Sequence, residues 1–167
     1  PSVLVDIGRV SDLNYIRDAG DHIAIGALTR HMDVETSAVL KEHVPLLAHA
    51  AGYVGDPQVR HRGTLGGTIA HADPASDLPA TTLALGATYV VQGPNGTREI
   101  AATDFYQGFL ESALEPDEML TEIRESGWPV GIKPSGGIRT PDDARAYLRL
   151  DDQIIDEHRA GPDTFSL

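Results

Sequence analysis

Residues 60–79 read Arg-His-Arg-Gly-Thr-Leu-Gly-Gly-Thr-Ile-Ala-His-Ala-Asp-Pro-Ala-Ser-Asp-Leu-Pro, which places bare backbone next to hydroxyl and carboxylate groups. At the centre of this stretch, Gly66 and Gly67 let the backbone approach a ligand closely and permit positive φ, so that successive N–H groups can turn toward one anion. Thr64 and Thr68 add a hydroxyl group on either side. An isolated Gly-Gly pair is typical of a plain turn between strands. With these neighbours, the pattern instead favours a site for a cofactor that carries phosphate and ribose.

Two carboxylates, those of Asp73 and Asp77, follow the glycine pair. They can accept hydrogen bonds from ribityl or ribose hydroxyls. Together with His61 and His71 they also suggest a metal site, but the stretch lacks a pair of histidines at helical i, i+4 spacing, and we predict no metal. Ser76 lies near histidine and aspartate without a Gly-x-Ser-x-Gly elbow, which argues against a hydrolase. We predict no catalytic residue in this chain.

The composition bounds the class of protein. A chain of 167 residues with 41% hydrophobic and 23% charged residues is long enough for one globular domain with an appendage. The absence of cysteine excludes disulfides, thiolate catalysis and cysteine ligation of an iron–sulfur cluster by this chain. A net charge of −12 argues against nucleic-acid binding. No apolar run approaches the ~20 residues of a membrane span, so we do not expect an integral membrane protein.

The first part of the chain predicts a β-hairpin or meander followed by helices. Residues 3–7 and 22–27 read as short strands, and the polar residues 17–21 supply a turn before the second. Apolar residues recur at roughly helical spacing over residues 33–53, and Pro45 divides them between two helices.

After the glycine stretch, the pattern alternates between strands and short helices. Asn95-Gly96 is a strong signal for a hairpin turn, and Thr103-Asp104 is a helix-capping pair. The expected elements are a helix at 78–85, strands at 87–91 and 98–100, a helix ending at 106, and a closing strand at 119–124. Together these elements predict an α+β fold.

The residues around the glycine pair resemble a known motif. Residues 55–68, Gly-Asp-Pro-Gln-Val-Arg-His-Arg-Gly-Thr-Leu-Gly-Gly-Thr, and the following Ala-Asp-Pro-Ala-Ser-Asp at 72–77 resemble the second flavin motif of the molybdenum hydroxylase family. The match is to the medium, FAD-binding subunit of aerobic carbon monoxide dehydrogenases and to the flavin domain of xanthine dehydrogenases. It implies that residues 1–125 form the second subdomain of a PCMH-type FAD-binding domain, with a mixed or antiparallel sheet and covering helices.

The resemblance also implies a function. Electrons would leave a molybdopterin-containing large subunit, cross the iron–sulfur clusters of a small subunit, and reach FAD on this cytoplasmic chain for passage to an acceptor. Leu120 would pack on the flavin ring. The family's upstream Ala-Gly-Gly-x-Ser loop has no match in this sequence, so we expect weak FAD binding by the isolated chain. The residues implied to contact FAD are Thr64, Leu65, Gly66, Gly67, Thr68, Asp73, Asp77 and Leu120.

Residues 126–167 predict a separate strand–loop–helix tail. Thr140, followed by Pro141 and two acidic residues, is a strong signal for the start of a helix. This segment resembles one unit of deoxyribose-phosphate aldolase, a TIM barrel, in which the lysine matching Lys133 assists proton transfer. One such unit does not bury its own apolar faces. The alternatives to a flavoprotein are therefore a lyase fragment acting on a phosphorylated aldehyde through Lys133, or a folded remnant that binds nothing.

The remaining charged residues leave alternatives open. Arg60 and Arg62 can pair with cofactor phosphates, bridge to Asp56 or lie at a subunit contact. The histidines outside the glycine stretch are expected to be solvated or packing residues, and they are His22, His31, His43, His49 and His158.

Overall fold

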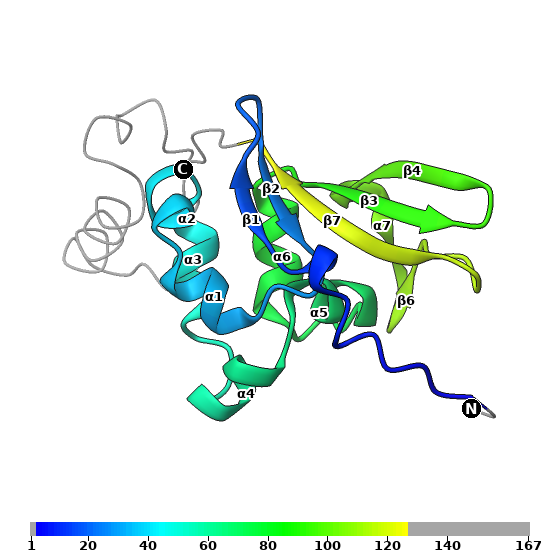
Figure 1. Cartoon of the computed structure of the whole chain (residues 1–167), viewed down its shortest axis with the longest axis horizontal. Helices are drawn as coiled ribbons and strands as arrows, with labels where there is room; N and C mark the ends of the chain where they lie inside the picture. The colour runs from blue at the N-terminus through cyan, green and yellow to red at the C-terminus, as the bar shows by residue number, and fades with distance from the viewer. Residues whose placement is uncertain (1–2, 127–167) are drawn as a thin grey trace, which may run out of the picture. The chain divides into compact units, whose positions relative to one another are not determined.

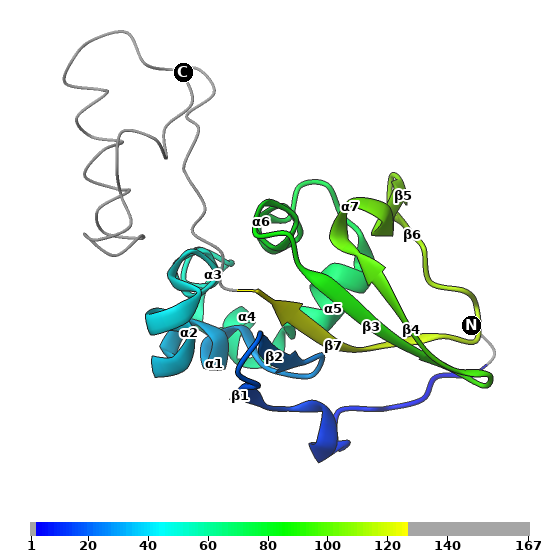
Figure 2. The same cartoon turned by 90° about the horizontal axis from the view of Figure 1, so that it is seen from above.

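The computed structural model describes residues 3–126, which form a five-stranded antiparallel sheet with the strand order β1-β2-β7-β3-β4 and covering helices (Figure 1). Helices α5, α6 and α7 lie on one face of this sheet (Figure 2). The predicted α+β class is confirmed. The predicted tail, with Lys133, lies outside the described residues, and the division at residue 125 stays a prediction.

The strands are short, and the helices are shorter than most in globular proteins. The strands are β1 (Ile16–Asp18), β2 (Ile23–Gly26), β3 (Thr88–Gly93), β4 (Gly96–Ala101), β5 (Tyr106–Gly108), β6 (Glu111–Ser112) and β7 (Met119–Glu125). The helices are the 3₁₀ turn η1 (Ser11–Leu13), α1 (His31–Thr36), α2 (Ala38–His43), α3 (Pro45–Ala51), α4 (Pro57–Arg62), α5 (Leu65–His71), α6 (Asp77–Ala84) and α7 (Ala102–Phe105). Strands β5 and β6 form a separate two-stranded ladder.

A β-bulge in the central strands decides which side chains of β7 face the helices. Val91 pairs with Leu120, whereas the preceding Val90 pairs with Glu122, so Thr121 is the extra residue. Residues directly opposite each other share a face, and neighbouring residues alternate. The bulge therefore places Leu120 and Glu122 on opposite faces of the sheet, although they are two positions apart.

The core lies between the sheet and its helices. The Tyr89 ring meets the Phe105 ring edge to face with centroids 4.8 Å apart, and the Tyr89 hydroxyl is hydrogen-bonded to Thr82 (2.7 Å) and to Tyr106 (3.0 Å). These bonds satisfy the polar end of a fully buried tyrosine. Further fully buried side chains come from β2, β7 and the helices, and they are Ile25, Val34, Leu40, Leu47, Leu65, Ile69, Leu78 and Ile123.

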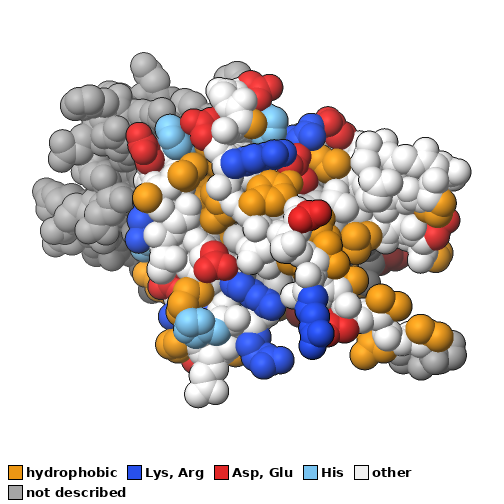
Figure 3. All heavy atoms as spheres, in the orientation of Figure 1, with side chains coloured by type: hydrophobic (Ala, Val, Ile, Leu, Met, Phe, Trp, Pro, Cys, Tyr) orange, Lys and Arg blue, Asp and Glu red, His pale blue; other side chains and the backbone are white. Residues whose placement is uncertain are grey.

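Most predicted elements are present, but Arg17 and Asp18, which were expected in a turn, belong to β1. Three further differences follow. Residues 3–7 pair with no strand among the described residues, and their apolar side chains are exposed, with Leu4 91% accessible. Figure 3 shows these side chains along the N-terminal arm. Residues 33–53 form part of three helices rather than two, because the Ser37 hydroxyl caps α2 by accepting from the Leu40 amide (3.2 Å). Pro45 begins α3, as the sequence indicated. The third difference, at the glycine pair, is described below.

No helix within residues 3–126 is both long enough and apolar enough to cross a lipid bilayer.

Candidate functional site

Two adjoining hollows lie where β2 ends, α5 begins and β7 begins, and together we call them the groove. Their volumes are about 340 and 470 Å³, and Arg30, Thr64 and Gly67 line both. The smaller hollow is further lined by Ile7, Gly8, Ala27, Leu28, Gly66, Ala70, Leu114, Glu118, Met119 and Leu120. The larger hollow is further lined by Arg62, Gly63, Thr68, His71 and Ser76.

The start of α5 is joined to the segment that follows β2 by backbone hydrogen bonds. The Leu65 amide donates to the Thr29 carbonyl (2.9 Å), and the Gly66 amide donates to the Ala27 carbonyl (2.9 Å). A Cβ atom on Gly66 would lie 2.5 Å from the Ala27 Cβ and 2.7 Å from its Cα. Glycine is therefore required at position 66, because α5 approaches the segment after β2 too closely for a side chain.

The glycine pair is helical, and the predicted anion-binding bend at this point is wrong. Neither Gly66 nor Gly67 is among the residues with positive φ in the described chain. The Gly66 amide is engaged by Ala27, and the Gly67 amide donates to Thr64 Oγ1 (3.2 Å), which caps α5. These two N–H groups are already bonded within the chain. The groove beside exposed Gly67 is nevertheless open, so a ligand would meet side chains and the bare Cα there.

The smaller hollow has apolar walls. Leu28, Leu114 and Met119 supply half-buried surfaces, and Leu120 is almost fully buried at the back. Such walls suit a flat apolar ring system, with polar atoms only at the rim.

A bidentate ion pair holds one wall of this hollow in place. The Arg98 guanidinium donates to both carboxylate oxygens of Glu118 (2.7 Å each) and to the Ala113 carbonyl (2.8 Å). The Glu115 amide also donates to Glu118 (2.9 Å). The hydrogen bonds from Arg98, with that amide, lower the pKa of Glu118 to about 2. The loop between β6 and β7 is thereby tied at both ends next to Leu114.

The larger hollow is basic and rich in hydroxyl groups. Arg30 Nη1 donates to the Arg62 carbonyl, and among residues 3–126 no carboxylate lies within 4.0 Å of either guanidinium. Thr68 and Ser76 contribute hydroxyls to the same lining. Guanidinium groups without a carboxylate partner, next to hydroxyl groups, are suited to phosphate oxygens.

His31 lies beneath this hollow and is buried. Its Nε2 is 3.0 Å from Thr68 Oγ1, and its Nδ1 has no hydrogen-bond partner among the described residues. Burial lowers the pKa of His31, the nearby Thr64 carbonyl opposes this shift, and the charge of Arg30 adds to it. The imidazole is therefore neutral at physiological pH.

The structure brings together most of the residues expected at the site. Thr64, Gly66, Gly67, Thr68 and Leu120 line the groove. Leu65 is fully buried in the core beneath it.

The predicted carboxylates lie farther along the chain. Asp73 accepts from the Ala75 amide (2.9 Å) in the turn before α6 and lines neither hollow. Asp77, exposed at the first residue of α6, lines a separate hollow of about 720 Å³ next to α3. The assignment of all these residues to a cofactor stays a prediction.

Sequence reasoning missed several residues that line the groove. Arg30 is 34 positions before Thr64, and an antiparallel bridge brings these two residues together. Leu114 and Met119 come from the loop that the Arg98–Glu118 pair orders. No sequence pattern indicated these contacts, since each depends on a pairing between distant segments.

The sequence left open whether Arg60 and Arg62 bind phosphate, pair with Asp56 or lie at a subunit contact. In the structure, Arg60 forms an ion pair with Glu35 (2.9 Å) rather than with Asp56. The Asp56 side chain instead caps α4 by accepting from the Val59 amide (2.9 Å).

No group of three histidine, aspartate or glutamate side chains in the part of the chain that the structure describes is placed to hold a metal ion.

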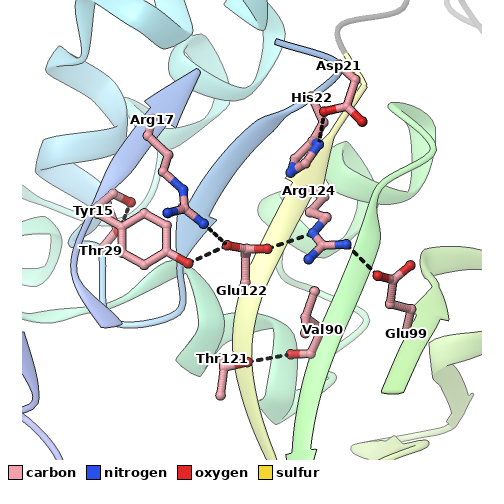
Figure 4. Close-up of polar contacts among 10 residues, drawn as sticks. All are labelled: Tyr15, Arg17, Asp21, His22, Thr29, Val90, Glu99, Thr121, Glu122 and Arg124. Carbon is pink, nitrogen blue, oxygen red and sulfur yellow. Dashed lines mark hydrogen bonds and ion pairs between the residues drawn. The ribbon is translucent and has the colours of Figure 1, made fainter. Parts of the chain in front are cut away.

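The opposite face of the sheet, which we call the polar face, carries a connected set of charged side chains (Figure 4). Glu122 accepts from the Tyr15 hydroxyl (2.5 Å), from Arg17 (3.2 Å) and from Arg124 (2.6 Å), and Arg124 also pairs with Glu99. Acidic and basic side chains therefore lie next to each other over these strands (Figure 3).

The pKa values of the polar face follow from these contacts. Burial raises the pKa of Glu122, but the hydrogen bonds from Tyr15 and Arg124 outweigh it, and the pKa is lowered. Burial and the bond to Glu122 raise the pKa of Tyr15 to about 12. The charged side chains named on the polar face are paired with one another within residues 3–126, unlike Arg30 and Arg62.

Comparison with known proteins gives one family and several relatives. Residues 1–124 match the family described as the FAD binding domain in molybdopterin dehydrogenase. The carbon monoxide dehydrogenase medium chain of Hydrogenophaga pseudoflava is 43% identical over 131 residues, which are 78% of this chain and 46% of that protein. The glyceraldehyde dehydrogenase medium chain of Sulfolobus acidocaldarius is 41% identical over 123 residues, 74% of this chain and 44% of that protein.

Solved structures give the same result. A carbon monoxide dehydrogenase from Hydrogenophaga pseudoflava superposes with a TM-score of 0.73 at 44% identity, covering 75% of this chain and 44% of that one. Quinoline 2-oxidoreductase from Pseudomonas putida 86 superposes with a TM-score of 0.76 at 34% identity, covering 78% of this chain and 46% of that one. The chain thus spans a little under half the length of these relatives.

Proposed function

Because the chain belongs to the family of FAD binding domains in molybdopterin dehydrogenases, we propose that it holds FAD in the groove and serves in the medium subunit of a molybdenum hydroxylase. The relatives that support a carbon monoxide dehydrogenase type are the medium chains with identities of 43% and 41%. In this proposal the chain is the flavoprotein part of an oxidoreductase, works in the cytoplasm, and does no substrate chemistry itself.

The observation that carries the proposal is the pairing of two unlike hollows at Gly67. FAD joins a flat, largely apolar ring system to a charged pyrophosphate, and the groove joins an apolar hollow to a basic one. A side chain at position 67 would stand where the two hollows meet, and the bare Cα keeps that passage open. The residues present therefore fit the cofactor.

We assign the parts of FAD to the parts of the groove by chemistry. Leu114, Met119 and Leu120 would pack on the isoalloxazine ring, because they form the apolar walls. Arg30 and Arg62 would bind the pyrophosphate oxygens.

The other site residues complete this assignment. Thr64 and Thr68 would contact the linker between ring and phosphates, next to the backbone of Gly66 and Gly67. Asp73 and Asp77 would accept from ribityl or ribose hydroxyls where the ligand leaves the groove, as the family resemblance implies.

The chain's own contribution is to bind, orient and shield the cofactor. The Arg98–Glu118 pair would keep the loop wall closed against water on one side of the ring. When bound, the flavin supplies the electron transfer, and the protein sets its position and surroundings. The proposed partners are a molybdopterin-containing large subunit and an iron–sulfur small subunit, which would deliver electrons for passage to an acceptor.

A fluorescence titration tests the proposal. Adding the chain to a fixed concentration of FAD is expected to change the flavin emission in a saturable way, and riboflavin, which lacks the pyrophosphate, is expected to bind more weakly. Equal affinity for both flavins would contradict the assignment of Arg30 and Arg62. No change in FAD emission at any chain concentration would contradict the proposed function itself.

A further inference from the structure

His31 is a buried histidine that touches a residue of the groove without lining the groove itself. Only 2% of its surface is accessible, and a Cβ on Gly63 would lie 2.8 Å from its Cε1. The backbone at Gly63 therefore covers one side of the ring. The His31 amide donates to the Gly63 carbonyl (3.1 Å), which fixes the histidine backbone on the same segment. The ring has little freedom to turn.

The two ring nitrogens of His31 differ in what they face. Nε2 lies 3.0 Å from the Thr68 hydroxyl oxygen, whereas Nδ1 has no hydrogen-bond partner among the described residues. A neutral imidazole carries one proton, and a buried N–H without an acceptor costs more than a buried lone pair. This difference favours the proton on Nε2, where the Thr68 oxygen accepts it.

This arrangement determines what Thr68 offers to a ligand. A hydroxyl group has one proton to donate, and when its oxygen accepts from a ring N–H, that proton is free to turn elsewhere. Thr68 lines the basic hollow with Arg30 and Arg62, so its proton can turn toward the side that an anion would occupy. A charged His31 would add a positive charge under the same hollow, but burial disfavours that form.

We infer that His31 is a positioning residue that holds Thr68 as a hydrogen-bond donor to an oxygen atom in the basic hollow. In the proposed function, on which this inference rests, that atom is a phosphate oxygen or a hydroxyl of FAD. His31 acts through Thr68 and touches no cofactor itself.

An NMR measurement on the full chain tests the inference without any ligand. Long-range ¹H–¹⁵N spectra near neutral pH are expected to show a neutral His31 ring with its proton on Nε2. Thr68→Val is expected to shift the Nε2 resonance, because the acceptor is removed. The inference would be overturned by a proton on Nδ1 or by a charged ring. It would also be overturned if the Nε2 chemical shift did not change in Thr68→Val.

A set of variants tests the effect on FAD affinity. Thr68→Val is expected to lower the affinity about tenfold, and His31→Phe about threefold, as one lost or misaligned hydrogen bond does. The double variant is expected to bind no more weakly than Thr68→Val alone, because both changes remove the same bond. His31→Gln keeps a donor at similar reach and is expected to restore most of the affinity.

The controls separate this inference from the proposed function. His49→Phe and Thr103→Val change an exposed histidine and an exposed threonine outside the groove, and both are expected to bind FAD like the parent chain. Additive losses in the double variant would overturn the role of His31. A parent chain that binds no FAD would overturn the proposed function, while the ring spectra still decide the state of His31. If His31→Phe does not fold, His31→Gln and the spectra decide.

Discussion

The polar face and the basic hollow of the groove differ in whether their charged groups have charged partners among residues 3–126. On the polar face, Glu122 accepts hydrogen bonds from a tyrosine and two arginines, and Arg124 continues to Glu99. In the groove, Arg30 and Arg62 face an open hollow with no carboxylate within 4.0 Å among residues 3–126.

This difference distinguishes charges that stabilise the fold from charges that are available to bind a ligand. A charge that is already paired within the chain contributes to stability and gains little from a ligand, whereas an unpaired guanidinium at a hollow is available to bind one. We therefore expect changes on the polar face to alter stability and changes in the groove to alter affinity for FAD. Four substitutions test that separation.

The largest effect is expected at Gly66, where the groove and the packing of the fold coincide. Gly66→Ala would place a methyl group 2.5 Å from the Ala27 Cβ, and we expect a loss of about 1–3 kcal/mol in the free energy of unfolding. The matched control is Gly67→Ala, whose Cβ would lie 2.7 Å from Thr64 Oγ1 and would disturb that helix cap but no backbone atom of a neighbouring segment, so we expect a smaller loss. Urea unfolding measures both, and equal losses at the two glycines would contradict the close contact with Ala27.

Glu122→Ala tests the polar face. Removing the carboxylate leaves Tyr15 without its acceptor and Arg17 next to Arg124, so we expect a loss of about 2 kcal/mol in stability. FAD affinity is expected to stay the same, because Glu122 and Leu120 lie on opposite faces of the sheet. A variant with normal stability and weakened FAD binding would reverse the assigned roles of the two regions.

Arg62→Ala is the complementary change in the groove. Loss of one phosphate-binding guanidinium is expected to lower FAD affinity about tenfold, or about 1.4 kcal/mol, with a change in stability below about 0.5 kcal/mol. Arg9→Ala is a suitable control, since this exposed arginine lines neither hollow. Flavin fluorescence and thermal unfolding together give both values, and a loss of stability without a loss of affinity would count against the basic hollow.

The smallest effect is the pH dependence contributed by Glu118. Its pKa is lowered from 4.5 to about 2 in the folded chain, so the carboxylate stabilises the fold above pH 4.5. This contribution is lost as the pH falls from about 4.5 toward 2. Glu118→Gln is expected to flatten the dependence of unfolding on pH in that window and to leave it unchanged above. An identical pH dependence in both chains would show that the Arg98 pair adds nothing measurable.

Local signals in the sequence predicted several of the strands and helices correctly, but the apolar run at residues 3–7 pairs with no strand among the described residues. The Asn95-Gly96 turn between β3 and β4, and the start of α3 at Pro45, depend on neighbouring residues alone. The glycine pair was interpreted as a bend because its sequence does not reveal that Ala27 lies close enough to require Gly66. Helix α5 therefore appeared as a loop, although Thr64 provides an ordinary helix cap.

The site was predicted only in part, because the sequence reveals contacts between neighbouring residues but not between distant segments. Thr64, Gly66, Gly67 and Thr68 are adjacent in the chain, and the motif identified them together. Arg30 reaches the groove through pairing of its segment with Thr64, and Leu114 through the loop held by Arg98. Such contacts depend on tertiary structure, and no local pattern in one sequence encodes them.

Backbone amide shifts during an FAD titration of the ¹⁵N-labelled chain test the central claim most directly. If the groove holds the cofactor, the largest changes are expected at Arg30, Gly67, Thr68 and Leu120, while Tyr15 and Arg124 on the polar face stay constant. Changes centred on the polar face, or none in the groove at saturating FAD, would contradict the account.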